Sequence, residues 1–133
     1  MSATDVEVVR RMYDAFNQAD YEAATAMLDD DVELHQAATI PDADSYFGRE
    51  DFLRGLTRWL SGFEPGFRYE VDEVVDGGER VFMRVGLRGR GRGSGAELEQ
   101  EAFNVWEVRD GKPFRLFVYW DEAEARAAAG LTP

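Results

Sequence analysis

Apolar residues recur at helical spacing in four stretches of the chain. A capping pattern at Thr4–Glu7 begins the first stretch, which predicts a helix that ends near Asn17. Asp20 can cap a second, short helix, and a third helix is expected after Gly48. A tail helix is predicted at Glu122–Ala129, where a glycine follows as a normal helix terminator.

Alternating apolar and polar residues predict the strands between these helices. The expected strands are Val32–His35, Phe67–Val75, Val81–Leu87, Leu98–Val108 and Phe114–Trp120. The order is helix, helix, strand, helix, four strands and a short helix, which is typical of an α+β fold with helices packed on a curved antiparallel sheet. No linker or repeat interrupts this order, so residues 1–133 are expected to form a single domain.

The last two predicted strands meet at Asp110-Gly111, a dipeptide that favours a two-residue hairpin turn. Pairing outward from this turn places Arg109 opposite Lys112 and Trp106 opposite Arg115. Because side chains alternate between faces, this register predicts two surfaces. The surface expected to line a pocket contains Gln100, Asn104, Trp106, Phe117, Tyr119 and Asp121. The opposite, apolar surface contains Phe103, Val105, Leu116, Val118 and Trp120.

Composition narrows the classes of function. The chain is 44% apolar, which is enough for a hydrophobic core, and its net charge of −12 argues against nucleic acid and anionic membranes as partners. It contains no cysteine, which excludes disulfides and thiolate chemistry. No signal peptide is visible and no apolar stretch approaches the ~18 residues of a membrane span, so a cytoplasmic location is expected.

Five motifs of the chain together resemble one family. They are the first helix with Tyr13 and Phe16, the strand Asp31–His35, the helix start Phe47–Glu50, the hairpin Val105–Lys112, and the run from Tyr119-Trp120-Asp121 to Leu131. They resemble the SnoaL-like, polyketide-cyclase-like branch of the nuclear transport factor 2-like superfamily. The resemblance implies a cone-shaped, cystatin-like fold, in which a strongly bent sheet encloses a deep pocket. It implies little about function, because such folds serve enzymes and binding proteins alike.

Asp121 is the first catalytic candidate. In the polyketide cyclases that the chain resembles, an aspartate just before the final helix acts as a general acid or base, and the resemblance implies this role for Asp121. A carboxylate in an apolar cavity has a raised pKa and can transfer protons near neutral pH. Asp121 and Glu124 also match a helix-capping pattern, so the residue can cap the tail helix instead, or serve both purposes.

His35 and Tyr13 are the other catalytic candidates. His35 is the only histidine, and the resemblance implies that it points into the pocket mouth, although a histidine at a strand end can equally be exposed. Tyr13 matches the oxyanion donor of the ketosteroid isomerase branch or is a core aromatic residue. That branch also needs an acid near Phe103, which is missing here, and a base for which only Asp42 and Asp44 are available. Its catalytic set is therefore incomplete.

The remaining candidates would shape a pocket and orient a ligand. They are Phe16, Trp59, Gln100, Asn104, Trp106, Phe117 and Tyr119. Asn104 stands where some cyclase-like members carry a histidine, and its amide can orient a carbonyl but cannot exchange protons at pH 7. One histidine, no cysteine and scattered carboxylates do not form a transition-metal ligand set, so neither a metal nor a cofactor is expected.

Two further motifs favour less specific interpretations. The epoxide-hydrolase branch uses two aspartates bridged by an arginine to activate water. Arg84 or Arg88 could supply the arginine, but the sequence shows no two aspartates to complete the set. Hydrolysis is therefore a minor option. The segment RGRGRGSG, residues 88–95, lacks the lysine and the following helix of a phosphate loop. A hairpin connection is the better interpretation of this segment.

Two functional hypotheses follow from these residues. In the first, the protein is a cofactor-independent cyclase or isomerase that acts on a cyclic or polyketide-like carbonyl compound. In the second, it is a non-catalytic module of the same fold that binds an apolar ligand or serves dimerisation. A homodimer through the apolar surface of Phe103, Val105, Leu116, Val118 and Trp120 is expected, because the tail helix is too short to cover that surface.

Overall fold

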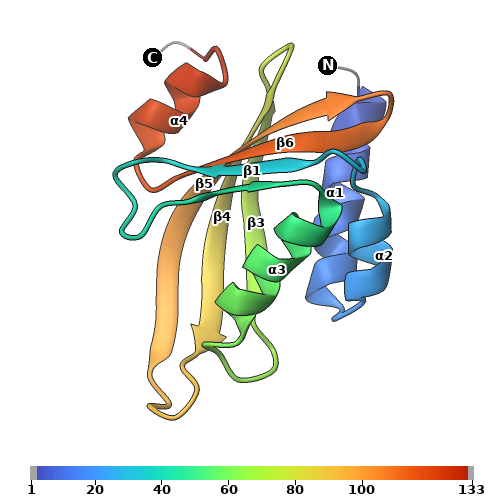
Figure 1. Ribbon diagram of the computed structural model, residues 1–133. Helices are drawn as coiled ribbons and strands as arrows, with labels where there is room; N and C mark the ends of the chain where they lie inside the picture. The colour runs from blue at the N-terminus through green and yellow to red at the C-terminus, as the bar shows by residue number, and fades with distance from the viewer. Residues whose placement is uncertain (1–2, 132–133) are drawn as a thin grey trace.

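The computed structural model describes residues 3–131, which form four helices and one six-stranded sheet (Figure 1). The helices are α1 (Ala3–Asn17), α2 (Tyr21–Ala26), α3 (Arg49–Leu60) and α4 (Glu122–Ala128). The strands are β1 (Glu33–Gln36), β2 (Ser45–Phe47), β3 (Arg68–Asp76), β4 (Val81–Arg90), β5 (Glu97–Arg109) and β6 (Lys112–Tyr119). No helix in this part of the chain is long and apolar enough to cross a membrane.

The sheet has the strand order β2-β1-β6-β5-β4-β3. Neighbouring strands are antiparallel except β1 and β6, which run parallel with Leu34 opposite Leu116. The predicted α+β class with helices against a curved sheet is confirmed, but the sheet is mixed and not antiparallel throughout. β1 lies between β2, which follows it in the chain and pairs with it antiparallel, and the distant strand β6, with which it pairs in parallel.

The main hydrophobic core fills the concave side of the sheet, where α1 and α3 lie (Figure 1). Val9 and Phe16 of α1 are buried in one cluster with Val85 of β4 and Trp106 of β5. Odd-numbered residues of β4 and even-numbered residues of β5 face this side, because strand residues alternate between faces. This alternation determines which side chains can line a cavity.

The hairpin of β5 and β6 has the predicted turn but a different register. Asp110 and Gly111 both have positive φ angles, 52° and 75°, as a tight Asp-Gly turn requires. Arg109 pairs with Lys112, but a bulge follows, so that Phe114 has no partner and Trp106 lies opposite Leu116. The predicted pairing of Trp106 with Arg115 is therefore wrong. One extra residue in a strand moves every later side chain to the other face.

The corrected register redistributes the two predicted surfaces. Phe117 and Tyr119 lie on the outer face with Phe103 and Val105, whereas Leu116, Val118 and Trp120 belong to the concave side. The five residues predicted to form one apolar surface, namely Phe103, Val105, Leu116, Val118 and Trp120, are thus divided between the two faces of the sheet.

Helix α4 covers part of the outer face, although the sequence predicts that it is too short to do so. Ala125 and Ala129 are buried in one cluster with Phe82, Phe103 and Val105 of the sheet. The short helix suffices because its alanines allow close approach and because Arg126 extends over the ring of Phe82 at 4.4 Å. The surface proposed for dimerisation does not exist in the expected form, and the homodimer itself stays a prediction.

Arginines of β4 face glutamates of β5 along the outer side of the hairpin that these strands form. Arg88 pairs with Glu99 at 3.3 Å, and Arg90 pairs with Glu97 at 2.9 Å. The connection 91–96 between the strands is short, in agreement with the hairpin predicted for RGRGRGSG. Arg88 and Arg90 therefore have acidic partners within the sheet, whereas Arg92 donates hydrogen bonds to the backbone carbonyl oxygens of Ser61 and Phe63.

Candidate functional site

A cavity of about 770 Å³ lies between the concave side of the sheet, α1 and α3. Its walls are mainly apolar and aromatic, which is typical of sites for small organic ligands. Five of the residues predicted for the site line it, namely Tyr13, Phe16, Trp59, Asn104 and Trp106. Even-numbered residues of β5 face inward, which places Asn104 and Trp106 on the inner face of the sheet. Helical spacing places Tyr13 and Phe16 on the side of α1 that faces them.

Tyr13 is the centre of a buried polar cluster in this cavity. Its hydroxyl oxygen accepts a hydrogen bond from Nδ2 of Asn104 at 2.6 Å and another from Nε1 of Trp106 at 2.9 Å. The hydroxyl donates to no group among residues 3–131, so its proton is free to bond to a ligand oxygen. Among residues 3–131, Asn104 is the one buried polar side chain apart from Tyr13 itself.

Burial keeps Tyr13 protonated. Desolvation raises the pKa of its hydroxyl from 10.0 to about 12, although the hydrogen bonds from Trp106 and Asn104 act in the opposite direction. Tyr69, whose ring packs edge-on against Tyr13 with centroids 5.8 Å apart, also has a pKa raised by burial. At neutral pH the cavity therefore presents a neutral O–H donor.

The mouth of the cavity is marked by lining residues that are exposed to solvent. Trp59 is 38% exposed and Trp120 is 41% exposed, and both line the cavity. Arg58 of α3 and the acids Asp42 and Asp44 of the loop after β1 are exposed lining residues as well. The mouth thus combines two aromatic side chains with charges of both signs.

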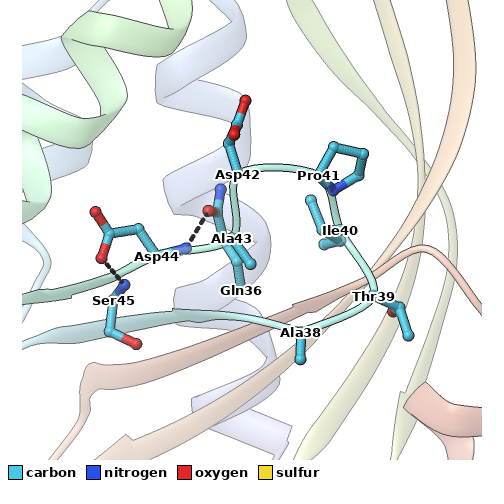
Figure 2. A pocket seen from close by; sticks show the side chains of 9 residues that line it. All are labelled: Gln36, Ala38, Thr39, Ile40, Pro41, Asp42, Ala43, Asp44 and Ser45. Atoms are coloured by element: carbon cyan, nitrogen blue, oxygen red, sulfur yellow. Dashed lines mark hydrogen bonds between the residues drawn. The ribbon is translucent and has the colours of Figure 1, made fainter.

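The loop of residues 37–44 forms one lip of this mouth. Together with Gln36 and Ser45, the same loop also lines a second pocket of about 640 Å³ (Figure 2). Oε1 of Gln36 accepts a hydrogen bond from the backbone N–H of Asp44 at 3.0 Å, which closes the loop. Ile40 is only 6% exposed because it lies against the cavity, and Asp42 adopts a positive φ of 58°. Figure 2 shows the Asp42 carboxylate directed away from the side of the loop that carries Ala38.

Asp121 does not line the cavity. It is exposed, and its carboxylate accepts a hydrogen bond from the backbone N–H of Glu124 at 2.9 Å as the N-cap of α4. The bulge in β6 is the reason, because it turns Trp120, and not Asp121, toward the concave side. Gln100 lies on the inner face of β5 but beyond the residues that line the cavity.

His35 lies on the outer face of the sheet, away from the cavity. Its ring stacks on Phe117 with centroids 5.2 Å apart, and Phe47 packs against its edge. Nε2 of His35 is 2.8 Å from Oε1 of Glu33, and this hydrogen bond is the main cause of the lowered pKa of Glu33. The structure does not bring His35, Asp121 and Tyr13 together.

Tyr119, also predicted to bind a ligand, is on this outer face, where burial raises the pKa of its hydroxyl. Arg84 lies on the outer face as well and pairs with Glu101 at 3.0 Å and Glu122 at 2.8 Å, so it bridges no aspartates in the cavity. Within residues 3–131, no group of histidines and carboxylates has a metal-binding arrangement.

Sequence reasoning missed several cavity residues. Those on the sheet and its end are Leu34, Leu116, Val118 and Trp120, and those at the mouth are Gln36 and Arg58. Asp42 and Asp44 also line the mouth, and the sequence had offered them only as possible bases of the ketosteroid isomerase set. Pro113 is the signal that could have revealed Leu116, Val118 and Trp120, which follow the bulge. A proline within a strand is often found at a bulge, and here Pro113 is paired beside the extra residue.

Comparison with known proteins identifies the family. The family model of the SnoaL-like domain matches residues 9–115. No curated protein is significantly similar to the chain in sequence.

Solved structures share the fold at low sequence identity. Bal32a from a soil-derived mobile gene cassette is 22% identical, with 92% of each chain covered and a TM-score of 0.77. TerC, co-crystallised with polyporic acid, is 18% identical over 96% of this chain and 98% of its own, with a TM-score of 0.77. A predicted SnoaL-like polyketide cyclase from Jannaschia sp. CCS1 is also 18% identical, over 100% and 98% of the two chains, with a TM-score of 0.77. The chain belongs to the SnoaL-like family of the nuclear transport factor 2-like superfamily.

Proposed function

We propose that the protein binds an apolar cyclic or polyketide-like carbonyl compound in the cavity and transfers protons on it, without a cofactor, as a cyclase or isomerase does. The observation that carries this proposal is the neutral, buried Tyr13 hydroxyl in a cavity whose walls are mainly apolar. Asn104 and Trp106 hold the hydroxyl oxygen in place and leave its proton for a ligand. A fixed donor in a dry site is the arrangement that stabilises negative charge on a carbonyl oxygen.

In this mechanism the carbonyl oxygen of the substrate accepts the Tyr13 hydrogen bond. Removal of a proton from the adjacent carbon moves electron density onto that oxygen, where the hydroxyl stabilises the enolate. The hydrogen bonds from Asn104 and Trp106 polarise the tyrosine, which strengthens its donation. Tyr13 thus serves as a donor and keeps its own proton throughout.

The proposed base is Asp42, at the lip of the cavity. It lines the cavity from the loop of residues 37–44, and its carboxylate has no hydrogen-bond or ion-pair partner among residues 3–131. Asp121 is not available for this step because its carboxylate caps α4. Asp42 would take the proton from the carbon beside the carbonyl and return it to another carbon of the enolate.

Similar proteins support the class of ligand. TerC was co-crystallised with polyporic acid, and the Jannaschia protein carries the description of a polyketide cyclase. Polyporic acid is therefore a natural first ligand for binding experiments with this chain.

Non-catalytic binding is the second candidate, and one observation favours it. The buried polar side chains of the cavity wall, Tyr13 and Asn104, are both neutral, and the cavity carboxylates in residues 3–131 are exposed. An exposed carboxylate stays hydrated, which makes it a weaker base toward a carbon acid than one held in a site without water. Ligand binding and proton transfer therefore need separate experiments.

Replacing Tyr13 by phenylalanine is expected to weaken the binding of 2-naphthol about fivefold, because one hydrogen bond to the ligand oxygen is lost. The same variant should bind naphthalene, which has no oxygen, as the unchanged protein does. Dissociation constants from fluorescence titration measure both effects.

Tyr21→Phe is the matched control, because Tyr21 is exposed and does not line the cavity. It should leave both dissociation constants unchanged. Equal binding of 2-naphthol by the unchanged protein and Tyr13→Phe would exclude the hydroxyl as the anchor of the ligand. Retained naphthalene binding shows that the cavity of the variant is intact.

Proton transfer is expected to appear as catalysed deuterium uptake at the carbon beside the carbonyl of 1-tetralone in D₂O, measured by NMR. Asp42→Asn should slow the catalysed exchange about a hundredfold or more, as loss of a general base does. Asp72→Asn is the control, because Asp72 is exposed on β3 and does not line the cavity. It should not change the rate of the catalysed exchange. Binding of 1-tetralone without exchange above the buffer rate would establish the second candidate, a non-catalytic binder.

A further inference from the structure

Arg58 is an unpaired cation at the mouth of the cavity. It lies on α3, lines the cavity, and its guanidinium forms no ion pair or hydrogen bond with residues 3–131. Ten other arginines in the same part of the chain form ion pairs. Arg10, Arg11 and Arg92 also form no ion pair with residues 3–131, but none of these three lines the cavity, whereas Arg58 does.

The acids that share the mouth do not neutralise Arg58. Asp42 and Asp44 lie on the loop wall, whereas Arg58 lies on the helix wall. Asp44 already accepts a hydrogen bond from the backbone N–H of Ser45 at 2.8 Å, and neither acid forms an ion pair with the arginine. The guanidinium therefore keeps its donors for a group that enters the mouth.

We propose that the natural ligand carries a carboxylate, which Arg58 binds at the mouth while the carbonyl oxygen reaches Tyr13 inside the cavity. A guanidinium presents paired N–H donors that match the two oxygens of a carboxylate. Tyr13 is buried and Arg58 is exposed, so the two groups contact opposite ends of one ligand. This inference rests on the proposed function, because it assigns the second polar contact of the same ligand.

The arrangement orients the ligand. The apolar walls accept the ring system in either direction, because they offer few polar contacts. When Arg58 holds the carboxylate at the mouth, the ligand can enter in one direction only, with its carbonyl end toward Tyr13. The arrangement also favours a ligand whose carboxylate and carbonyl are separated by a ring system.

Two probes test this inference, 2-naphthol and 6-hydroxy-2-naphthoate, which differ by one carboxylate. The unchanged protein should bind the carboxylate probe about fivefold more tightly at low ionic strength, the effect of a partly exposed ion pair. Arg58→Gln should abolish this preference, so that the variant binds the two probes with equal affinity. The preference of the unchanged protein should also shrink in about 1 M salt, where charges are screened within ~3 Å.

Arg54→Gln is the matched control. It removes the same charge from the same helix, but Arg54 pairs with Asp51 and does not line the cavity. It should keep the preference for the carboxylate probe. Equal binding of both probes by the unchanged protein, or a preference that survives in Arg58→Gln, would overturn the role of Arg58. Failure of 2-naphthol itself to bind would instead contradict the proposed function.

Discussion

Replacing Phe82 by alanine is expected to lower the free energy of unfolding by about 4 kcal/mol. Phe82 is fully buried on the outer face of β4, where Ala125 and Ala129 of α4 cover it and Arg126 lies over its ring. Removal of a buried aromatic ring loses its transfer free energy and leaves a cavity, which together cost about 3–5 kcal/mol. Denaturant unfolding curves of both proteins measure the difference.

Phe47→Ala is the control for this prediction, since Phe47 is 61% exposed and its ring contacts the edge of His35. Its truncation should cost less than about 1 kcal/mol, as most surface substitutions do. A loss at Phe82 as small as this would mean that α4 does not cover the outer face in solution.

The protein is also expected to lose stability steeply between about pH 10 and pH 12. The pKa of Tyr13 is about 12 in the folded protein, against 10.0 for an unperturbed tyrosine. In this window the unfolded chain loses the proton while the folded chain keeps it, so the free energy of unfolding falls as the pH rises. The difference in pKa corresponds to about 3 kcal/mol from Tyr13, present in full below pH 10.

Tyr69 acts in the same direction, because its pKa is also raised by burial. Its hydroxyl has no hydrogen bond within residues 3–131, so Tyr69→Phe leaves no partner unsatisfied. This variant should match the unchanged protein at pH 8 and lose less stability at pH 11. Tyr21→Phe should follow the unchanged protein at both values. Parallel curves for Tyr69→Phe and the unchanged protein would show that Tyr69 is already accessible to solvent in the folded state.

Local chemistry made much of this fold predictable. The Asp110-Gly111 turn is correct because this dipeptide tolerates two successive positive φ angles. Asp20 caps α2 as predicted, through a hydrogen bond from the N–H of Ala23 at 3.1 Å. Asp121 caps α4 in the way that one interpretation of the sequence predicted. Each of these features depends on residues that are neighbours in the chain.

Strand register and the pairing of distant strands were harder to predict, because they do not depend on neighbouring residues alone. Phe114 lies outside the pairing of β5 and β6, and this one residue, marked in the sequence only by the neighbouring Pro113, exchanges the faces of Phe117 and Leu116. The pairing of β1 with β6 depends on packing across the whole sheet, which hydrophobic periodicity in a short strand does not record.

The candidate site was predicted best where it depends on helices and on β5. Tyr13, Asn104 and Trp106 meet in the cavity because helical spacing and strand alternation place them there before the bulge is reached. His35 and Asp121 were placed by resemblance, and the structure puts both outside the cavity lining. Arg58 carries no sequence motif, so its position at the mouth required the fold.

Parallel pairing of β1 with β6 links the order of folding to the order of synthesis. In the described part of the chain β1 bonds only to β2 and β6, and Glu33 pairs with Arg115. In a growing chain on the ribosome, β1 therefore cannot join the rest of the sheet until β6 has emerged. Closing so long a loop is entropically costly and slow. The wall that carries Leu34, Leu116 and Val118 is consequently the last part of the cavity to be completed.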